Sequence, residues 1–102
     1  MKKLLFYSLI LLANICIGQK IERINSSEHL KKNYPFSEAT IVNGVIYLSG
    51  EIGTFPNGKL IEGGIKAETN QTLMNIKNTL NRMGASMDDV FKCTCMLSDI
   101  SE

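Results

Sequence analysis

The stretch ATIVNGVIYLSG, residues 39–50, decides how this chain folds. Two runs of β-branched and apolar residues flank Asn43-Gly44, a dipeptide that accepts the positive φ angles of a type I′ turn. The pattern therefore predicts a β-hairpin. Its second run, Val45–Leu48, is apolar on both faces, which predicts a strand covered on both sides.

The residues after the hairpin predict a loop and then an amphipathic helix. Residues 51–63 contain Pro56-Asn57-Gly58 and lead to Gly63-Gly64, as expected of a loop. A helix is expected from about Ile65 to Met83, because apolar residues recur there at spacings of three and four: Leu73, Ile76, Leu80 and Met83. Gly84 is expected to end this helix as the first residue beyond its C-cap.

A capped turn and another β-prone segment come next. Ser86-Met87-Asp88-Asp89 predicts a short capped turn, and Val90–Leu97 predicts a strand. A strand, a helix and a strand in this order form a βαβ unit with a right-handed crossover. The hairpin and the βαβ unit together predict an α+β domain, in which a three-stranded sheet carries one helix.

The C-terminal residues predict that the sequence is incomplete. Asp99 and Glu102 have the spacing of the N-cap and N3 residues of a further helix. Val90–Leu97 is also too apolar for a bare edge strand. We therefore expect the domain to need more chain than residues 19–102 provide.

The N-terminal residues have the pattern of a signal peptide. Lys2-Lys3 precedes an apolar stretch, residues 4–15, and small residues stand at Cys16 and Gly18. We expect residues 1–18 to be a signal peptide, cleaved after Gly18, so that the mature protein is periplasmic or secreted and free of the membrane. An uncleaved anchor and a lipid anchor on Cys16 are the alternatives.

Composition and motifs exclude several classes of function. The chain has 102 residues, enough for one small domain, and its net charge of +1 favours neither nucleic acid nor an anionic membrane as partner. No dinucleotide fingerprint, phosphate-binding loop, zinc-ligand spacing or serine elbow is present. The sequence therefore predicts no metal site.

The cysteines and the histidine are expected to have no role in chemistry. Cys93 and Cys95 point to one face of the predicted strand, where they cannot pair with each other and are expected to be buried. His29, the sole histidine, lies in a polar N-terminal segment and is expected to be solvated rather than catalytic.

Four short motifs between Tyr34 and Asp99 form a recognisable series. They are PFSEA at 35–39, VIYLSGEIG at 45–53, QTLMNI at 71–76, and VFKCT at 90–94 with LSD at 97–99. In this order they resemble the RidA (reactive intermediate deaminase A) family. That family has a Pro-aromatic-Ser-x-Ala segment, a strand ending in Ser-Gly-Gln-Ile, a Gln-Thr/Ser-Leu-x-Asn-Ile/Val helix motif, and a Val-x-Lys-x-Thr strand followed by Asp.

The resemblance implies a fold, an assembly and an activity. It implies a chorismate-mutase-like α+β domain that forms a homotrimer with clefts between subunits. It implies hydrolysis of small imines or enamines, such as 2-iminobutanoate, to 2-oxo acids and ammonia, with no cofactor because an imine is already electrophilic. The substrate-binding residues that it implies in this chain are Phe36, Ser49, Gly50 and Glu51.

This sequence departs from the family pattern at three places. Glu51 stands where the family usually has Gln, and Phe36 stands where many active members have Tyr. The family's Pro-x-Arg segment and late Glu would lie beyond Glu102, so no catalytic residue is expected in this chain and its activity is expected to be impaired. The alternative is a ligand-binding, chaperone-like or ribonuclease-like member of the same fold.

Overall fold

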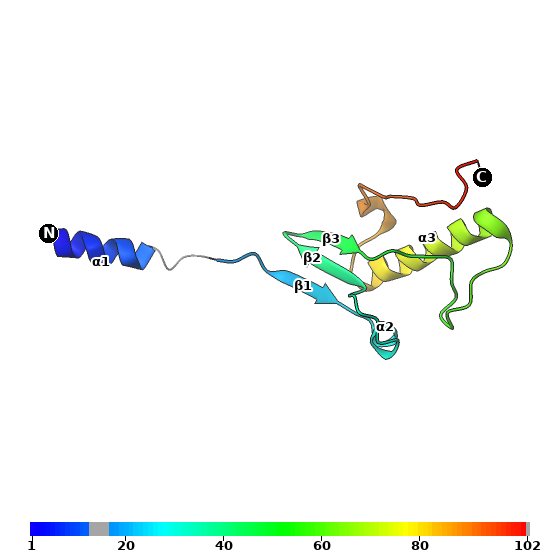
Figure 1. Ribbon diagram of the computed structural model, residues 1–102, viewed down its shortest axis with the longest axis horizontal. Helices are drawn as coiled ribbons and strands as arrows, with labels where there is room; N and C mark the ends of the chain where they lie inside the picture. Colours follow the sequence, from blue (N-terminus) through cyan, green and yellow to red (C-terminus); the bar gives the residue numbers. More distant parts are fainter. Residues whose placement is uncertain (13–16, 102) are drawn as a thin grey trace. The chain divides into compact units, whose positions relative to one another are not determined.

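The computed structural model describes residues 1–12 and 17–101 (Figure 1). Its contacts divide the chain into two compact units, with the boundary between Ser49 and Gly50. The first unit begins with helix α1, Lys2–Leu12. Within the described ranges no helix is both long and apolar enough to cross a membrane. Cys16, the predicted alternative anchor site, lies outside the described residues, as does Glu102.

The first unit is built on a three-stranded antiparallel sheet with the order β1-β2-β3 (Figure 1). Strands β2, Ala39–Val42, and β3, Val45–Leu48, form the predicted hairpin. Asn43 and Gly44 have φ angles of 50° and 78°, as a type I′ turn requires, so the hairpin prediction is confirmed. Tyr47 is 56% exposed, and the expectation that β3 is covered on both faces is wrong for that residue.

The remaining strand of this sheet is β1, Ile21–Ile24, which the sequence pattern did not predict. The Ile-x-x-Ile spacing points the two isoleucines to opposite faces of a strand, so it gives no alternating signal. The strand forms because β2 supplies its backbone partners, with Ile21 opposite Val42 and Ile24 opposite Ala39. A short helix, α2, Ser27–Lys31, follows β1, and Ser26 caps it by accepting the His29 N–H at 3.1 Å.

The second unit contains the predicted helix as α3, Gly64–Arg82 (Figure 1). Gly84 has a φ of 78°, its N–H donates to the Asn81 carbonyl, and the Ala85 N–H donates to the Leu80 carbonyl at 3.0 Å. These bonds form a Schellman motif and confirm the role predicted for Gly84. Leu80 is buried, whereas Leu73, on the same predicted stripe, is 43% exposed.

The capped turn is also confirmed, as a short 3₁₀ helix, η1, Met87–Asp89. The Asp89 carboxylate accepts the Ser86 N–H at 2.8 Å, and the Asp89 N–H donates to the Ser86 carbonyl at 3.1 Å. A local sequence signal was sufficient here, because both partners of these bonds lie within one turn.

Residues 90–97 do not form the expected strand. Within the described part of the chain, strand pairing joins β1, β2 and β3, and one isolated bridge joins Thr54 to Leu60. A β-prone segment becomes a strand only where a neighbour supplies its hydrogen-bond partners, and none of the described segments pairs with this one. Cys93 and Cys95 are both exposed, so the predicted burial, which depended on that strand, is wrong.

Candidate functional site

Phe36 lies in a cluster of rings in the first unit. The Tyr34 and Phe36 rings are stacked, with centroids 5.1 Å apart and planes 8° apart. The His29 ring meets both edge-on, with centroid distances of 5.3 and 5.5 Å. Phe36 itself remains 51% exposed. The cluster therefore orients the Phe36 ring and leaves one side of it available to a ligand.

The ring cluster changes the interpretation of His29. Its Nε2 lies 2.7 Å from the Phe36 carbonyl oxygen, and because a carbonyl only accepts, this nitrogen carries the hydrogen. His29 is half-buried and hydrogen-bonds the segment that carries Phe36, so its side chain has a structural contact in addition to its exposure to solvent. The sequence offered no signal for this contact beyond the aromatic residues at 34 and 36.

Glu38 connects three segments of the first unit. Its Oε2 accepts the Ser26 N–H at 2.8 Å, and its own N–H donates to Asn25 Oδ1 at 2.9 Å. Its carbonyl oxygen accepts the Ser49 N–H at 3.0 Å. The backbone at Ser49 is thus tied directly to the segment that carries Phe36. The structure therefore places these two predicted site residues on adjoining segments.

Gly50 and Glu51 begin a folded loop, residues 50–63, in the second unit. The loop closes on itself through the bridge between Thr54 and Leu60 and through the Ile61 N–H, which donates to the Gly53 carbonyl at 2.9 Å. These bonds satisfy backbone groups inside the loop. The loop is consequently a defined structure rather than an open connection.

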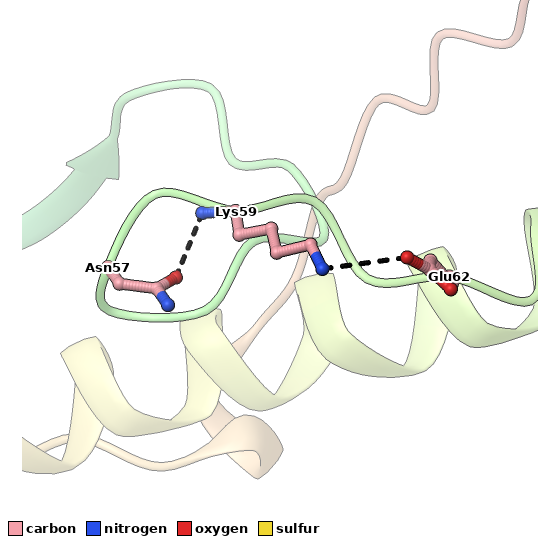
Figure 2. Close-up of polar contacts among 3 residues, drawn as sticks. All are labelled: Asn57, Lys59 and Glu62. Atoms are coloured by element: carbon pink, nitrogen blue, oxygen red, sulfur yellow. Dashed lines mark hydrogen bonds and ion pairs between the residues drawn. The ribbon is translucent and has the colours of Figure 1, made fainter.

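The tip of the loop carries two further polar contacts, shown in Figure 2. Asn57 Oδ1 accepts the Lys59 N–H at 3.0 Å, and Lys59 Nζ lies 3.5 Å from Glu62 Oε1. The two charged side chains are 69% and 88% exposed, and such a pair contributes little to stability. The backbone bonds, rather than this ion pair, hold the loop together.

Gly53 brings the loop against helix α3. A Cβ built on Gly53 would lie 2.6 Å from the Glu68 carbonyl oxygen and 2.8 Å from the Glu68 Cα. Thr72 Oγ donates to the same carbonyl at 2.7 Å, so the oxygen that faces Gly53 is hydrogen-bonded. The close approach explains why glycine follows Glu51-Ile52 in this sequence.

Asn75 on α3 makes a second attachment of the loop to the helix. Its Nδ2 donates to the carbonyl oxygens of Thr54, at 2.9 Å, and Ile52, at 3.2 Å. The same nitrogen lies 3.3 Å from Glu51 Oε1. Its Oδ1 accepts from Gln71 Nε2 at 2.9 Å. Asn75 and Gln71 are residues that the motif at 71–76 contained but that sequence reasoning did not assign to the site.

The predicted site residues thus divide between the two units. Phe36 and Ser49 lie in the first, and Gly50 and Glu51 lie in the second. Glu51 is the only one of the four with an ionisable side chain. Among the described residues, no three His, Cys, Asp or Glu side chains lie close enough together to hold a metal ion.

Asp99, the last residue of the motif series, has a perturbed carboxyl group. The Ser101 hydroxyl and then the Ser101 backbone N–H hydrogen-bond to it and lower its pKa from the ordinary value of 3.8. The hydroxyl lies 2.6 Å and the backbone nitrogen 2.9 Å from Asp99 Oδ1. Asp99 is therefore ionised at neutral pH. Its carboxylate holds the backbone and side chain of Ser101 and thus orders the last described residues.

The fold and these motifs define a class of protein. The profile of the family described as Endoribonuclease L-PSP matches residues 26–102, which include the ring cluster, the loop and the helix motif. The chain therefore belongs to this RidA/L-PSP family, and the resemblance inferred from the motifs is confirmed.

The matching relatives include proteins named as deaminases and a protein whose name states no activity. The chain is 39% identical over 69 residues to the bovine and human proteins named 2-iminobutanoate/2-iminopropanoate deaminase, covering 67% of this chain and 50% of each relative. It is 42% identical over 66 residues to Protein HMF1 of Saccharomyces cerevisiae, covering 65% of this chain and 51% of that protein. The chain spans about half the length of the curated relatives it matches.

A solved structure supports the fold. The crystal structure of YEO7_yeast superposes on this chain with a TM-score of 0.56 and 31% sequence identity, over 68% of this chain and 55% of that one. The predicted α+β fold of the RidA type is therefore confirmed for the part of the domain that the chain spans.

Proposed function

We propose that the whole protein hydrolyses small imines or enamines, of the 2-iminobutanoate type, to 2-oxo acids and ammonia. The observation that carries the proposal is the 39% identity to relatives named 2-iminobutanoate/2-iminopropanoate deaminase. The family match over residues 26–102 supports it, because that range includes Phe36, Ser49, Gly50 and Glu51. No cofactor is required, since the C=N carbon already accepts a nucleophile.

The reaction balances with water as the only other reactant. Water adds to the C=N carbon of the 2-imino acid to give a 2-amino-2-hydroxy acid, and the C–N bond then breaks to release ammonia and leave a C=O group. The roles proposed for this chain are in binding: the exposed side of the Phe36 ring contacts the alkyl group, and Ser49 and the Gly50 backbone contact polar atoms.

Glu51 sets the proposed orientation of the substrate. A carboxylate repels the carboxylate of a 2-imino acid and attracts a protonated imine nitrogen. The substrate is therefore proposed to bind with its nitrogen, rather than its carboxylate, toward Glu51. The cation that holds the substrate carboxylate is proposed to come from the remainder of the domain, and the assembly is proposed to be a homotrimer.

The activity can be tested on the native protein by generating 2-iminobutanoate in situ and measuring its hydrolysis. We expect the protein to release ammonia well above the spontaneous rate. Control reactions with buffer alone and with heat-denatured protein measure that spontaneous rate. A structured RNA is incubated with the same preparation, because the family description includes endoribonuclease. RNA cleavage together with imine hydrolysis at the spontaneous rate would reject the deaminase proposal.

We also propose that the protein is exported and that residues 1–18 are removed. The proposal rests on the Lys2-Lys3 start, the apolar stretch and the small residue at Gly18. N-terminal sequencing of the protein from its native source is expected to begin at Gln19, as glutamine or its cyclised form. Recovery of protein that retains Met1, from a cytoplasmic fraction, would contradict export.

A further inference from the structure

We propose that Asn75 is a positioning residue: it holds residues 51–54 of the loop on helix α3 and fixes the direction of the Glu51 carboxylate. The inference rests on the proposed function for the chemistry that Glu51 serves. The attachment of loop residues 51–54 to α3 is inferred from the geometry of the second unit alone. Asn75 contacts no substrate in this proposal and acts through the loop.

The chemistry of the contacts requires an amide at this position. The loop presents two carbonyl oxygens and a carboxylate oxygen to Asn75, and all three accept hydrogen bonds. Of the two ends of the amide, only the NH₂ end can donate to them, with its two hydrogens shared among the three acceptors. The Oδ1 end faces Gln71 Nε2, a donor, at 2.9 Å. The orientation of the Asn75 amide is thus determined by partners on both sides.

The attachment is strengthened by the close contact at Gly53. Gly53 packs on the Glu68 backbone, and Glu68 and Asn75 have the i, i+7 spacing that puts residues on one face of a helix. The Thr54 N–H donates to the Ile52 carbonyl at 2.8 Å, which makes a tight turn around Gly53 and brings both of the carbonyls bound by Asn75 together. The loop therefore meets one face of α3 at two points.

The attachment to α3 restricts the direction of the Glu51 carboxylate. Glu51 is exposed, and an exposed carboxylate on a loop would ordinarily sample many directions. The 3.3 Å contact from Asn75 Nδ2 to Glu51 Oε1, together with the bond to the next carbonyl along the chain, limits those directions. Small displacements of a group that orients a substrate lower the rate strongly.

The test compares three variants of the full protein: Asn75→Leu, which removes every polar contact, Asn75→Asp, which keeps the size, and Asn78→Ala as the matched control. Asn78 is an exposed asparagine of the same helix. We expect Asn75→Leu to lower kcat/KM for imine hydrolysis by about tenfold and Asn78→Ala to leave it within about twofold.

The Asn75→Asp variant separates positioning from simple structural support. At neutral pH the introduced carboxylate faces two carbonyls and Glu51, so we expect a loss as large as that of Asn75→Leu. Proximity to Glu51 raises the pKa of the introduced carboxyl group, and once protonated it can donate again. Activity relative to wild type should therefore recover as the pH is lowered toward about 5. The absence of such a recovery, with Asn75→Leu equally active as wild type, would overturn the inference.

Limited trypsin digestion at Lys59 gives a measurement that does not depend on activity. Lys59 lies near the tip of the loop, and release of residues 51–54 from α3 should speed cleavage there at least about fivefold in Asn75→Leu but not in Asn78→Ala. Faster cleavage in a protein whose wild type lacks imine turnover would reject the proposed function and keep the positioning role. Unchanged cleavage with active wild type would reject the positioning role alone.

Discussion

Replacing Gly53 by alanine is expected to lower the free energy of unfolding by about 2–3 kcal/mol, and the melting temperature by roughly 10–15 °C. The added Cβ would lie 2.6 Å from the Glu68 carbonyl oxygen, a backbone atom held by Thr72 Oγ, so a side-chain rotation cannot relieve the clash. Either the loop or the helix must move. Since native domains are stable by only about 5–15 kcal/mol, this is a large fraction of the total.

Thermal unfolding of the full protein measures this effect. Gly50→Ala is the matched control for stability, because a Cβ on Gly50 would have no heavy atom of the described residues within 4 Å other than those of Gly50 and its two chain neighbours. We expect the control to change the melting temperature by no more than a degree or two. Equal stability of Gly53→Ala and wild type would show that the loop does not approach α3 as closely as described.

Removing the carboxylate of Glu38 is expected to have the second large effect on stability. Glu38→Ala should lower the free energy of unfolding by about 2 kcal/mol, because the partly buried Ser26 N–H loses a charged acceptor at 2.8 Å. Glu38→Gln keeps an acceptor oxygen and should cost less than about 1 kcal/mol. Urea denaturation of both variants, beside Glu22→Ala on the exposed strand β1, measures the difference.

The Glu38 variants also have a local signature. Ser26 caps α2, and Ser49 is bound through the Glu38 main chain, which alanine retains. We therefore expect the loss of stability in Glu38→Ala to be concentrated at residues 25–31. The hydrogen bond from the Ser49 N–H to the Glu38 carbonyl should remain in place. A destabilisation of Glu38→Gln as great as that of Glu38→Ala would mean that the charge, rather than the acceptor oxygen, carries the interaction.

The elements predicted correctly are those whose signals are local. Asn43-Gly44 specifies its turn through the φ angles that two adjacent residues accept, and Gly84 ends α3 through bonds to residues of the same last turn. Strand β1 and residues 90–97 could not be judged in this way. Whether each becomes a strand depends on whether a distant segment supplies its backbone partners. Of these two segments, β2 pairs with β1 and not with residues 90–97.

The same distinction applies to the candidate site. The motifs identified the segments that carry Phe36, Ser49, Gly50 and Glu51, because those segments are recognisable as short strings of residues. Asn75 was not assigned to the site because its partners in the loop lie 21 to 24 residues away along the chain. An asparagine that falls off the apolar stripe of a helix looks the same in sequence whether it faces water or a loop.

Strand β2 occupies the middle of its sheet, and this has a consequence for how the first unit opens. Each residue of β2 is paired with β1 on one side and with β3 on the other, whereas β1 and β3 each have one strand neighbour among the residues that the structure describes. Fluctuations of lowest cost therefore peel away an outer strand and leave the central one covered. The segment that carries Phe36 leads directly into β2. The ring cluster is therefore joined to the strand whose backbone amide hydrogens are expected to exchange most slowly with solvent.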